Sequence, residues 1–103
     1  MAIRVPSHAT VTHVRVELFG MPRILAGRKH VELALEAQAD RAALSRALAL
    51  ICPALVGKVI RADGSDIEDG YVFNLNGTAF LPAEVPRLSE GDNLLLLSSQ
   101  AGG

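Results

Sequence analysis

Two stretches of alternating apolar and polar residues constrain this chain more than any other feature. The first runs from His13 to Phe19, with valines and a leucine on one side and Arg15 and Glu17 on the other. The second, from Arg28 to Leu35, alternates in the same way. A period of two predicts two half-buried strands, each with one face that needs cover. Between them, Arg23 to Gly27 predicts a short turn or a single helical turn.

An amphipathic segment that follows the second strand predicts the helix that covers these faces. Asp40 is a suitable N-cap, because its carboxylate can accept a hydrogen bond from the free amides of a first helical turn. Beyond it, apolar residues recur at spacings of four, three and four, and Pro53 limits the helix. They are Leu44, Leu48, Ile51 and Leu55. We interpret Arg41, Ser45 and Arg46 as lying off this apolar face.

The second half of the chain predicts further strands separated by turns. The segment 61–70 is polar and is expected to be a solvated loop, and 71–75 is expected to be a strand. Asn76-Gly77 favours a tight hairpin turn, because these two residue types accept positive φ. The segment 78–81 is expected to return from that turn as a short strand.

The last strand is expected over Asn93 to Leu97, where a run of leucines predicts a central strand covered on both faces. A chain of 103 residues has room for one domain. The sequence therefore predicts an α+β fold, with a mixed sheet of four to five strands and one main helix packed on one face. We place a flexible N-terminal extension at 1–12, the domain at 13–97 and a flexible C-terminal tail at 98–103.

No catalytic or metal-binding motif can be argued from the sequence. Gly57-Lys58 lacks the upstream glycine of a phosphate-binding loop, because Cys52 stands at that position. Cys52 is the only cysteine and is expected to be a small core residue. The acidic residues of 63–69 do not have the spacing of an EF-hand loop. The histidines lie at unrelated spacings and are expected at the surface.

Charge and hydropathy patterning exclude two classes of partner. The formal net charge is −1, we take the signs to be interspersed, and aromatic residues make up 4% of the chain. A basic footprint and stacking aromatic residues are what nucleic-acid binders need, so no nucleic-acid partner is expected. The N-terminus has no continuous apolar segment typical of a signal peptide, and no apolar run is long enough for a membrane span. A cytoplasmic, soluble protein is expected.

Two features point to a protein partner instead. Phe19 falls on the polar side of its strand, and an exposed aromatic residue there favours an interface, unless Met21 or Leu97 covers it locally. The other feature is the segment Ser98 to Gly103, which is small or polar and follows directly from a central strand. Its two final glycines lack Cβ, so an extended chain there can pass through a narrow channel.

Four segments together resemble the MoaD/ThiS family of sulfur carriers, which are relatives of ubiquitin with the β-grasp fold. They are Val16 to Gly27, the Leu75-Asn76-Gly77 hairpin, the Glu90-Gly91-Asp92 turn and the final Ala101-Gly102-Gly103. The resemblance implies that an adenylyltransferase of the MoeB/ThiF type binds the domain and joins AMP to the Gly103 carboxylate. A persulfide sulfur would then displace AMP and leave a thiocarboxylate. ATP and Mg would belong to that enzyme, and this chain would bind no cofactor or metal and hold no catalytic site of its own.

The resemblance also implies contact residues and a pathway. The likeness is to the MoaD branch, the small subunit of molybdopterin synthase, whose tail enters a MoaE-like large subunit. Phe19 and Leu97 match large residues of the family's docking patch, and Gln100 and Ala101 lie in the tail beside Gly102. Ser98-Ser99 stands where MoaD proteins carry two prolines. Other readings therefore stay open: a ThiS-like or other carrier for thiamine thiazole or cysteine, a protein modifier that forms isopeptide bonds with lysines, or a plain interaction domain.

Overall fold

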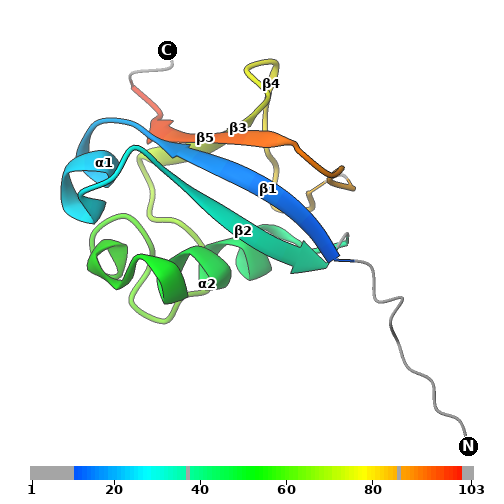
Figure 1. The fold of residues 1–103 in the computed structure, drawn as a ribbon. Helices are drawn as coiled ribbons and strands as arrows, with labels where there is room; N and C mark the ends of the chain where they lie inside the picture. The colour runs from blue at the N-terminus through cyan, green and yellow to red at the C-terminus, as the bar shows by residue number, and fades with distance from the viewer. Residues whose placement is uncertain (1–10, 37, 86, 101–103) are drawn as a thin grey trace, which may run out of the picture.

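The computed structural model describes residues 11–36, 38–85 and 87–100. The elements are β1 (Val11–Leu18), α1 (Met21–Ala26), β2 (His30–Glu36), α2 (Arg41–Ile51), the 3-10 helix η1 (Pro53–Leu55), β3 (Tyr71–Leu75), β4 (Ala79–Phe80) and β5 (Asn93–Ser98). The strands form one sheet in the order β2-β1-β5-β3-β4. β1 and β5 are parallel, and the other neighbours are antiparallel. α2 lies across one face of this sheet (Figure 1). The predicted α+β class is confirmed.

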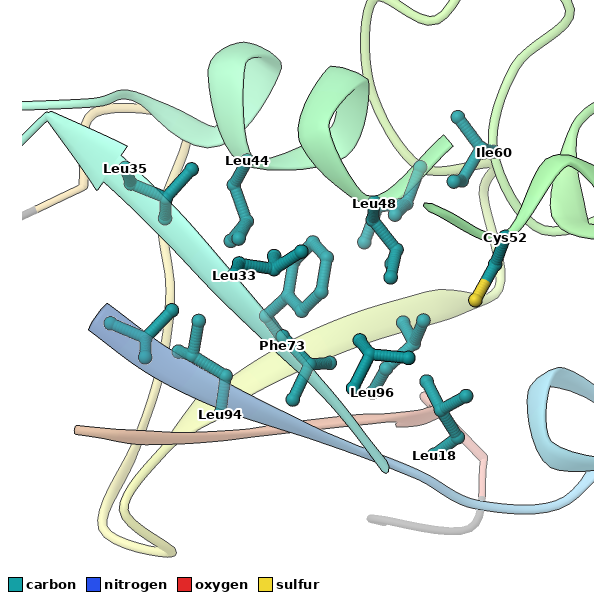
Figure 2. Packing of buried hydrophobic residues seen from close by; sticks show 14 of the residues in the cluster. Leu18, Leu33, Leu35, Leu44, Leu48, Cys52, Ile60, Phe73, Leu94 and Leu96 are labelled. Atoms are coloured by element: carbon teal, nitrogen blue, oxygen red, sulfur yellow. The ribbon is translucent and has the colours of Figure 1, made fainter. Parts of the chain in front are cut away.

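The covered face of the sheet and α2 meet in a single, mainly aliphatic layer. Phe73 of β3 is fully buried near the middle of this layer, with Leu33 of β2 and Leu44 of α2 beside it (Figure 2). Side chains of β1 and β5 on the same face complete the layer. They are Val14, Val16, Leu18, Leu94 and Leu96. Burial of such a side chain stabilises a fold by about 1.5–3 kcal/mol, so this layer holds the helix to the sheet.

The N-cap of α2 is confirmed, but its buried face is rotated from the predicted one. The amide of Ala43 donates to Asp40 Oδ1 over 2.8 Å. Ser45 is fully buried, whereas Ile51 is 43% exposed, so both of these predictions were wrong. Ser45 and Leu48 both lie on the buried side of the helix. Ile51 therefore lies at the edge of the interface with the sheet.

Leu55 is buried as predicted, but it reaches the core from a separate element. The helix ends at Cys52, whose φ of −125° and ψ of 71° leave the helical region. Pro53 then begins η1, and Leu55 packs into the core from there. Cys52 itself is a buried core residue, as expected.

The bounds of the first two strands differ from the prediction by one to two residues. β1 begins at Val11, which pairs with Glu36, so the described part of the predicted extension 1–12 already belongs to the sheet. Residues 1–10 of that extension lie outside the described residues. β2 begins at His30, because Gly27 ends α1 with a φ of 71° and the chain needs two more residues to reach the sheet. The single helical turn expected over 23–27 is α1.

The hairpin turn between β3 and β4 is confirmed. Asn76 has a φ of 54° and Gly77 a φ of 77°, which is the positive-φ pair that such a tight turn requires. The returning strand is shorter than predicted, since only Ala79 and Phe80 pair with β3.

The segment 61–70 is only partly the solvated loop that was expected. Asp66 accepts from Arg41 Nε and Nη2, each over 2.8 Å, and Arg41 Nη1 also donates to the Leu81 carbonyl over 3.1 Å. The guanidinium of Arg41 holds the pKa of the Asp66 carboxyl below its usual range, chiefly through these hydrogen bonds. Ile67 is buried. The pair therefore ties the start of α2 to the loop and to the segment that follows β4.

The leucine run of β5 is central in the sheet, as predicted, but it is covered on one face only. Leu94 and Leu96 are fully buried against the layer under α2. Leu95 and Leu97 point to the other face and are half-buried. No helix of the described residues lies on that face (Figure 1), so the prediction of cover on both faces was wrong. We call it the open face.

Candidate functional site

The C-terminal segment leaves the sheet from its central strand. Ser98 pairs with Tyr71 at the end of β5, and the amide of Ser99 donates to the Gly70 carbonyl over 2.8 Å. The amide of Gln100 donates to Ser98 Oγ over 3.2 Å. The predicted tail of 98–103 is therefore anchored to the body through Ser99.

The predicted reacting group falls outside the part of the chain that the structure describes. Gly102 and Gly103, together with the contact residue Ala101, lie beyond the described range, so their predicted roles stay predictions. Gln100 is exposed next to them.

The two predicted docking residues lie at the same end of the sheet as this anchor. The amide of Phe19 donates to the Leu96 carbonyl over 3.1 Å, which places Phe19 beside the end of β5. Phe19 is 40% exposed, so neither Met21 nor Leu97 covers it fully. Leu97 is half-buried on the open face, where it pairs with Val72. The structure thus brings Phe19, Leu97 and the root of the tail together.

Further apolar residues extend this pair into a strip across the open face. Leu95 pairs with Asn74, and Asn74 also pairs with Phe80, which is 54% exposed. We call the set the open-face strip. Its members are Phe19, Val72, Phe80, Leu95 and Leu97. The sequence analysis missed three of them, although the alternation of β3 already set Val72 opposite to the buried Phe73.

The other half of the open face is charged. Arg15 Nη2 lies 2.9 Å from His30 Nε2, and Arg15 Nε lies 3.9 Å from Glu32. Asn93 Nδ2 donates to Glu17 Oε2 over 2.9 Å at the boundary with the strip. The open face is therefore divided: its side chains are mainly polar or charged over β1 and β2, and mainly apolar over β5, β3 and β4, where Asn74 lies between Leu95 and Phe80.

A shallow pocket of about 220 Å³ lies beside Ser99 and is lined by the segment 66–72 with Arg41, Arg61 and Leu81. The Arg41–Asp66 ion pair occupies its wall, and Arg61 lies 3.7 Å from Asp69. Both cations of the lining are thus paired with carboxylates, and Glu68 is the remaining carboxylate. The pocket presents no nucleophile with a general base beside it.

Other reactive groups were sought over the described ranges. Burial raises the pKa of the Cys52 thiol, which disfavours the reactive thiolate. In residues 11–36, 38–85 and 87–100, no group of three or more His, Cys, Asp or Glu side chains could hold a metal ion. No helix in those ranges has the length and apolar character to cross a membrane.

Comparison with known proteins defines the class of this fold. No family model matches the sequence, and no curated protein matches it. Solved structures do match, and they share the β-grasp fold of ubiquitin-like proteins.

Three of these structures show the range of the likeness. SAMP1 (small archaeal modifier protein 1) from Haloferax volcanii is 26% identical, with a TM-score of 0.71 over 88% of this chain and 99% of that chain. A putative molybdopterin converting factor, subunit 1, from Pyrococcus furiosus is 20% identical, with a TM-score of 0.63 over 84% and 97%. Urm1 from Trypanosoma brucei is 19% identical, with a TM-score of 0.56 over 91% and 98%. The predicted resemblance to β-grasp carriers and ubiquitin-like proteins of the MoaD/ThiS type is confirmed.

Proposed function

We propose that this chain is a sulfur carrier whose reacting group is the carboxylate of Gly103. The observation that carries the proposal is the position of the tail. The central strand β5 leads directly into it, and within the described residues the last backbone hydrogen bond to the body is that of Ser99 with Gly70. A rigid root beside an exposed apolar strip suits a domain that docks on an enzyme and offers its terminal residues to that enzyme's active site.

The chemistry divides between this chain and its partner. A carboxylate oxygen of Gly103 attacks the α-phosphorus of ATP, which releases pyrophosphate and forms an acyl-adenylate. The terminal sulfur of an enzyme persulfide then attacks the acyl carbon and releases AMP. The product is an acyl disulfide that links Gly103 to the enzyme's sulfur. A thiolate then attacks the inner sulfur, on the enzyme side of this S–S bond. A new disulfide forms there, and a thiocarboxylate is left on Gly103. ATP, Mg and the sulfur donor belong to the partners.

The docking surface in this proposal is the open-face strip. Phe19 and Leu97 lie next to the tail root, so an enzyme that takes in the tail comes into contact with them. The first partner is a MoeB/ThiF-like adenylyltransferase. The second is a sulfur acceptor, for which we propose the MoaE-like large subunit of molybdopterin synthase. The likeness to a putative molybdopterin converting factor supports this choice.

A second function has support from another likeness. SAMP1 is named a modifier protein, and it is the neighbour with 26% identity and a TM-score of 0.71. In a modifier, the same acyl-adenylate would pass its acyl group to a lysine amine and form an isopeptide bond. Both functions share the activation step at Gly103 and differ only in the nucleophile that follows. A carrier for thiamine thiazole or cysteine would differ only in the acceptor.

Intact-mass spectrometry tests the proposal and separates these functions. The chain is incubated with an adenylyltransferase of the MoeB/ThiF type from the same genome, ATP, Mg and a persulfide donor. Exchange of one oxygen for sulfur on Gly103 supports the carrier. Conjugates on lysine residues support the modifier, and an unchanged mass contradicts both.

A matched control variant replaces Gly102 and Gly103 with alanine. The two added Cβ atoms leave the terminal carboxylate in place but widen the segment that must pass into the enzyme. We expect slower adenylylation with the fold unchanged. Equal rates for both chains would contradict a narrow channel for the tail.

A further inference from the structure

Two segments of the chain carry several basic residues and no acidic one. The segments 18–31 and 41–62 contain no Asp or Glu. Besides Arg46 of α2, four basic residues of these segments are exposed, and no salt bridge or side-chain hydrogen bond of the described residues involves them. They are Arg23, Arg28, Lys29 and Lys58. The expectation that charges of both signs are interspersed is therefore wrong for this region.

The fold brings these two segments together. α1, which carries Arg23, packs against η1, which Lys58 follows by three residues. Arg28 lies near Cys52 at the end of α2, where its positive charge partly offsets the rise that burial causes in the pKa of the thiol. Ile24 is 72% exposed on α1 between these charges. We call Arg23, Ile24, Arg28, Lys29 and Lys58 the basic end.

The basic end lies beside the root of the tail. α1 contacts β5, and it follows directly after Phe19, whose amide is bonded to the Leu96 carbonyl. Figure 1 shows α1 at the end of the sheet where β5 finishes. Residues 100–103 span at most roughly 14 Å when extended, at about 3.5 Å per residue. An enzyme that holds Gly103 in its active site must therefore approach this end of the molecule closely.

We propose that the basic end docks on an acidic surface of the activating adenylyltransferase, next to the entrance of its tail channel. This proposal rests on the proposed function. Charges within a Debye length of about 8–10 Å still act on each other at physiological salt. Four uncompensated cations at the contact would repel a basic surface, whereas an acidic one accelerates association and fixes orientation. The partner surface thus carries carboxylates around an apolar site for Ile24.

The open-face strip and the basic end then have separate roles. The strip supplies apolar area that is insensitive to salt. The basic end supplies a long-range attraction that weakens as salt rises. The domain can therefore select its activating enzyme through the charge of the basic end and bind it through the apolar contacts of the open-face strip.

The experiment compares two charge-reversal variants with the same change in net charge. The test variant is Arg28→Glu/Lys58→Glu in the basic end. The control is Arg46→Glu/Arg87→Glu, in which Arg46 lies on α2 against Gly64 and Arg87 lies in the segment before β5. Association with the adenylyltransferase is measured by stopped-flow at about 0.05 and 0.5 M salt, after melting curves confirm that all chains fold. A further variant, Lys29→Arg/Lys58→Arg, keeps the charge but removes both lysines.

We expect the test variant to associate about tenfold to a hundredfold more slowly at low salt, and the difference to shrink at high salt. The control and the arginine variant should behave like the original chain. Equal rates for the test and control variants would overturn the proposal. So would preferential binding of the basic end to an RNA oligonucleotide, or salt-dependent self-association through the acidic residues of 63–69.

The proposed function and the docking proposal can be tested separately. A chain without Gly102 and Gly103 should still bind the enzyme with the same salt dependence, although it cannot be adenylylated there. If the intact chain binds in a charge-dependent manner but forms no adenylate, the proposed function fails and the docking proposal stands. Absence of binding by every variant overturns both.

Discussion

The covered and open faces of the sheet are built from the same strands, but they carry different side chains. The difference matches what lies over each face: α2 on one side and no helix of the described residues on the other. Under α2, the alternate residues of β1, β2, β3 and β5 are mostly aliphatic or aromatic and buried, with Thr12 as a buried polar exception. On the open face, the other residues of the same strands are mainly polar or charged over β1 and β2 and mainly apolar over β5, β3 and β4.

This difference separates folding from binding. A face that packs in a single layer is mainly apolar, because a void or an unpaired polar group there destabilises the fold. The open face has no such constraint, so an exposed apolar strip on it contributes little to stability. The strip leads to the root of the tail, which is consistent with a docking role.

The largest expected effect is on the covered face. Phe73→Ala should lower the free energy of unfolding by about 3–5 kcal/mol, because it leaves a cavity in the middle of the layer. Urea-induced unfolding followed by circular dichroism measures this change. The matched control is Phe80→Ala, which truncates an exposed phenylalanine on the open face and should cost less than about 1 kcal/mol. Similar losses for the two variants would contradict the division between the faces.

A smaller effect is expected at the ion pair that closes the edge of the covered face. Asp66→Asn should cost about 1 kcal/mol near neutral pH, because it removes the charge from a bidentate, partly buried pair with Arg41. The pKa of Asp66 is lowered in the folded state, so the pair stabilises the fold above the pKa of the unfolded carboxyl, about 3.9. That stability is lost as pH falls through the lower folded pKa.

Urea unfolding of both chains between about pH 2 and pH 7 checks this dependence. The difference between the chains should be constant above about pH 5 and should shrink below about pH 4. Asp63→Asn is the control, since the pKa of Asp63 is also lowered, but by a local hydrogen bond with Ser65 on the exposed loop. An equally large pH-dependent difference for the control would show that the contact between α2 and the loop is not the cause.

On the open face, the expected change is in binding more than in stability. Phe19→Asp should cost less than about 1 kcal/mol of folding free energy, but it should weaken binding to the activating enzyme tenfold or more. Isothermal titration calorimetry and thermal melting measure the two quantities. Val11→Asp is the control, because Val11 is 51% exposed on the same face at the far end of β1. Unfolding of the Phe19 variant alone would show that Phe19 is a core residue.

The smallest change in stability is expected at the tail. Deletion of Gly103 should leave the melting temperature nearly unchanged, because the sheet is already anchored at Ser99 and a terminal glycine has no side chain to pack. The same deletion should abolish acyl-adenylate formation, as measured by release of pyrophosphate. A fall of several degrees in the melting temperature would mean that the tail packs on the body.

Most of the fold could be predicted from the sequence because the local patterns favour the same strands, helix and turn that the packed structure contains. The alternation of β1 and β2, the Asp40 cap and the Asn76-Gly77 turn each depend on residues near in sequence, and each is confirmed. The wrong predictions concern features that depend on contacts between residues distant in the sequence. Ser45 is buried and Ile51 is not, because the angle at which α2 meets the sheet selects its buried stripe.

The residues of the candidate site also fall into two groups, those predicted from the sequence and those that only the structure reveals. Phe19 and Leu97 were predicted by resemblance, and the structure places them together. The remaining members of the open-face strip come from β3, β4 and β5, whose pairing no local pattern specifies. The basic end joins residues 23–29 to Lys58, which lies 29 positions further along the chain, so only their packing reveals it.

By itself, the sequence determined the periods of the strands and the helix, the turn at Asn76-Gly77 and the small, polar character of the terminal segment. Backbone sterics and the burial of apolar residues act over a few neighbours, so these features can be read locally. Only the tertiary structure decided that β5 lies between β1 and β3, that one face of its leucine run stays open and that α1 lies beside the tail root. Strand order and layer packing depend on contacts between distant segments, which a linear pattern does not encode.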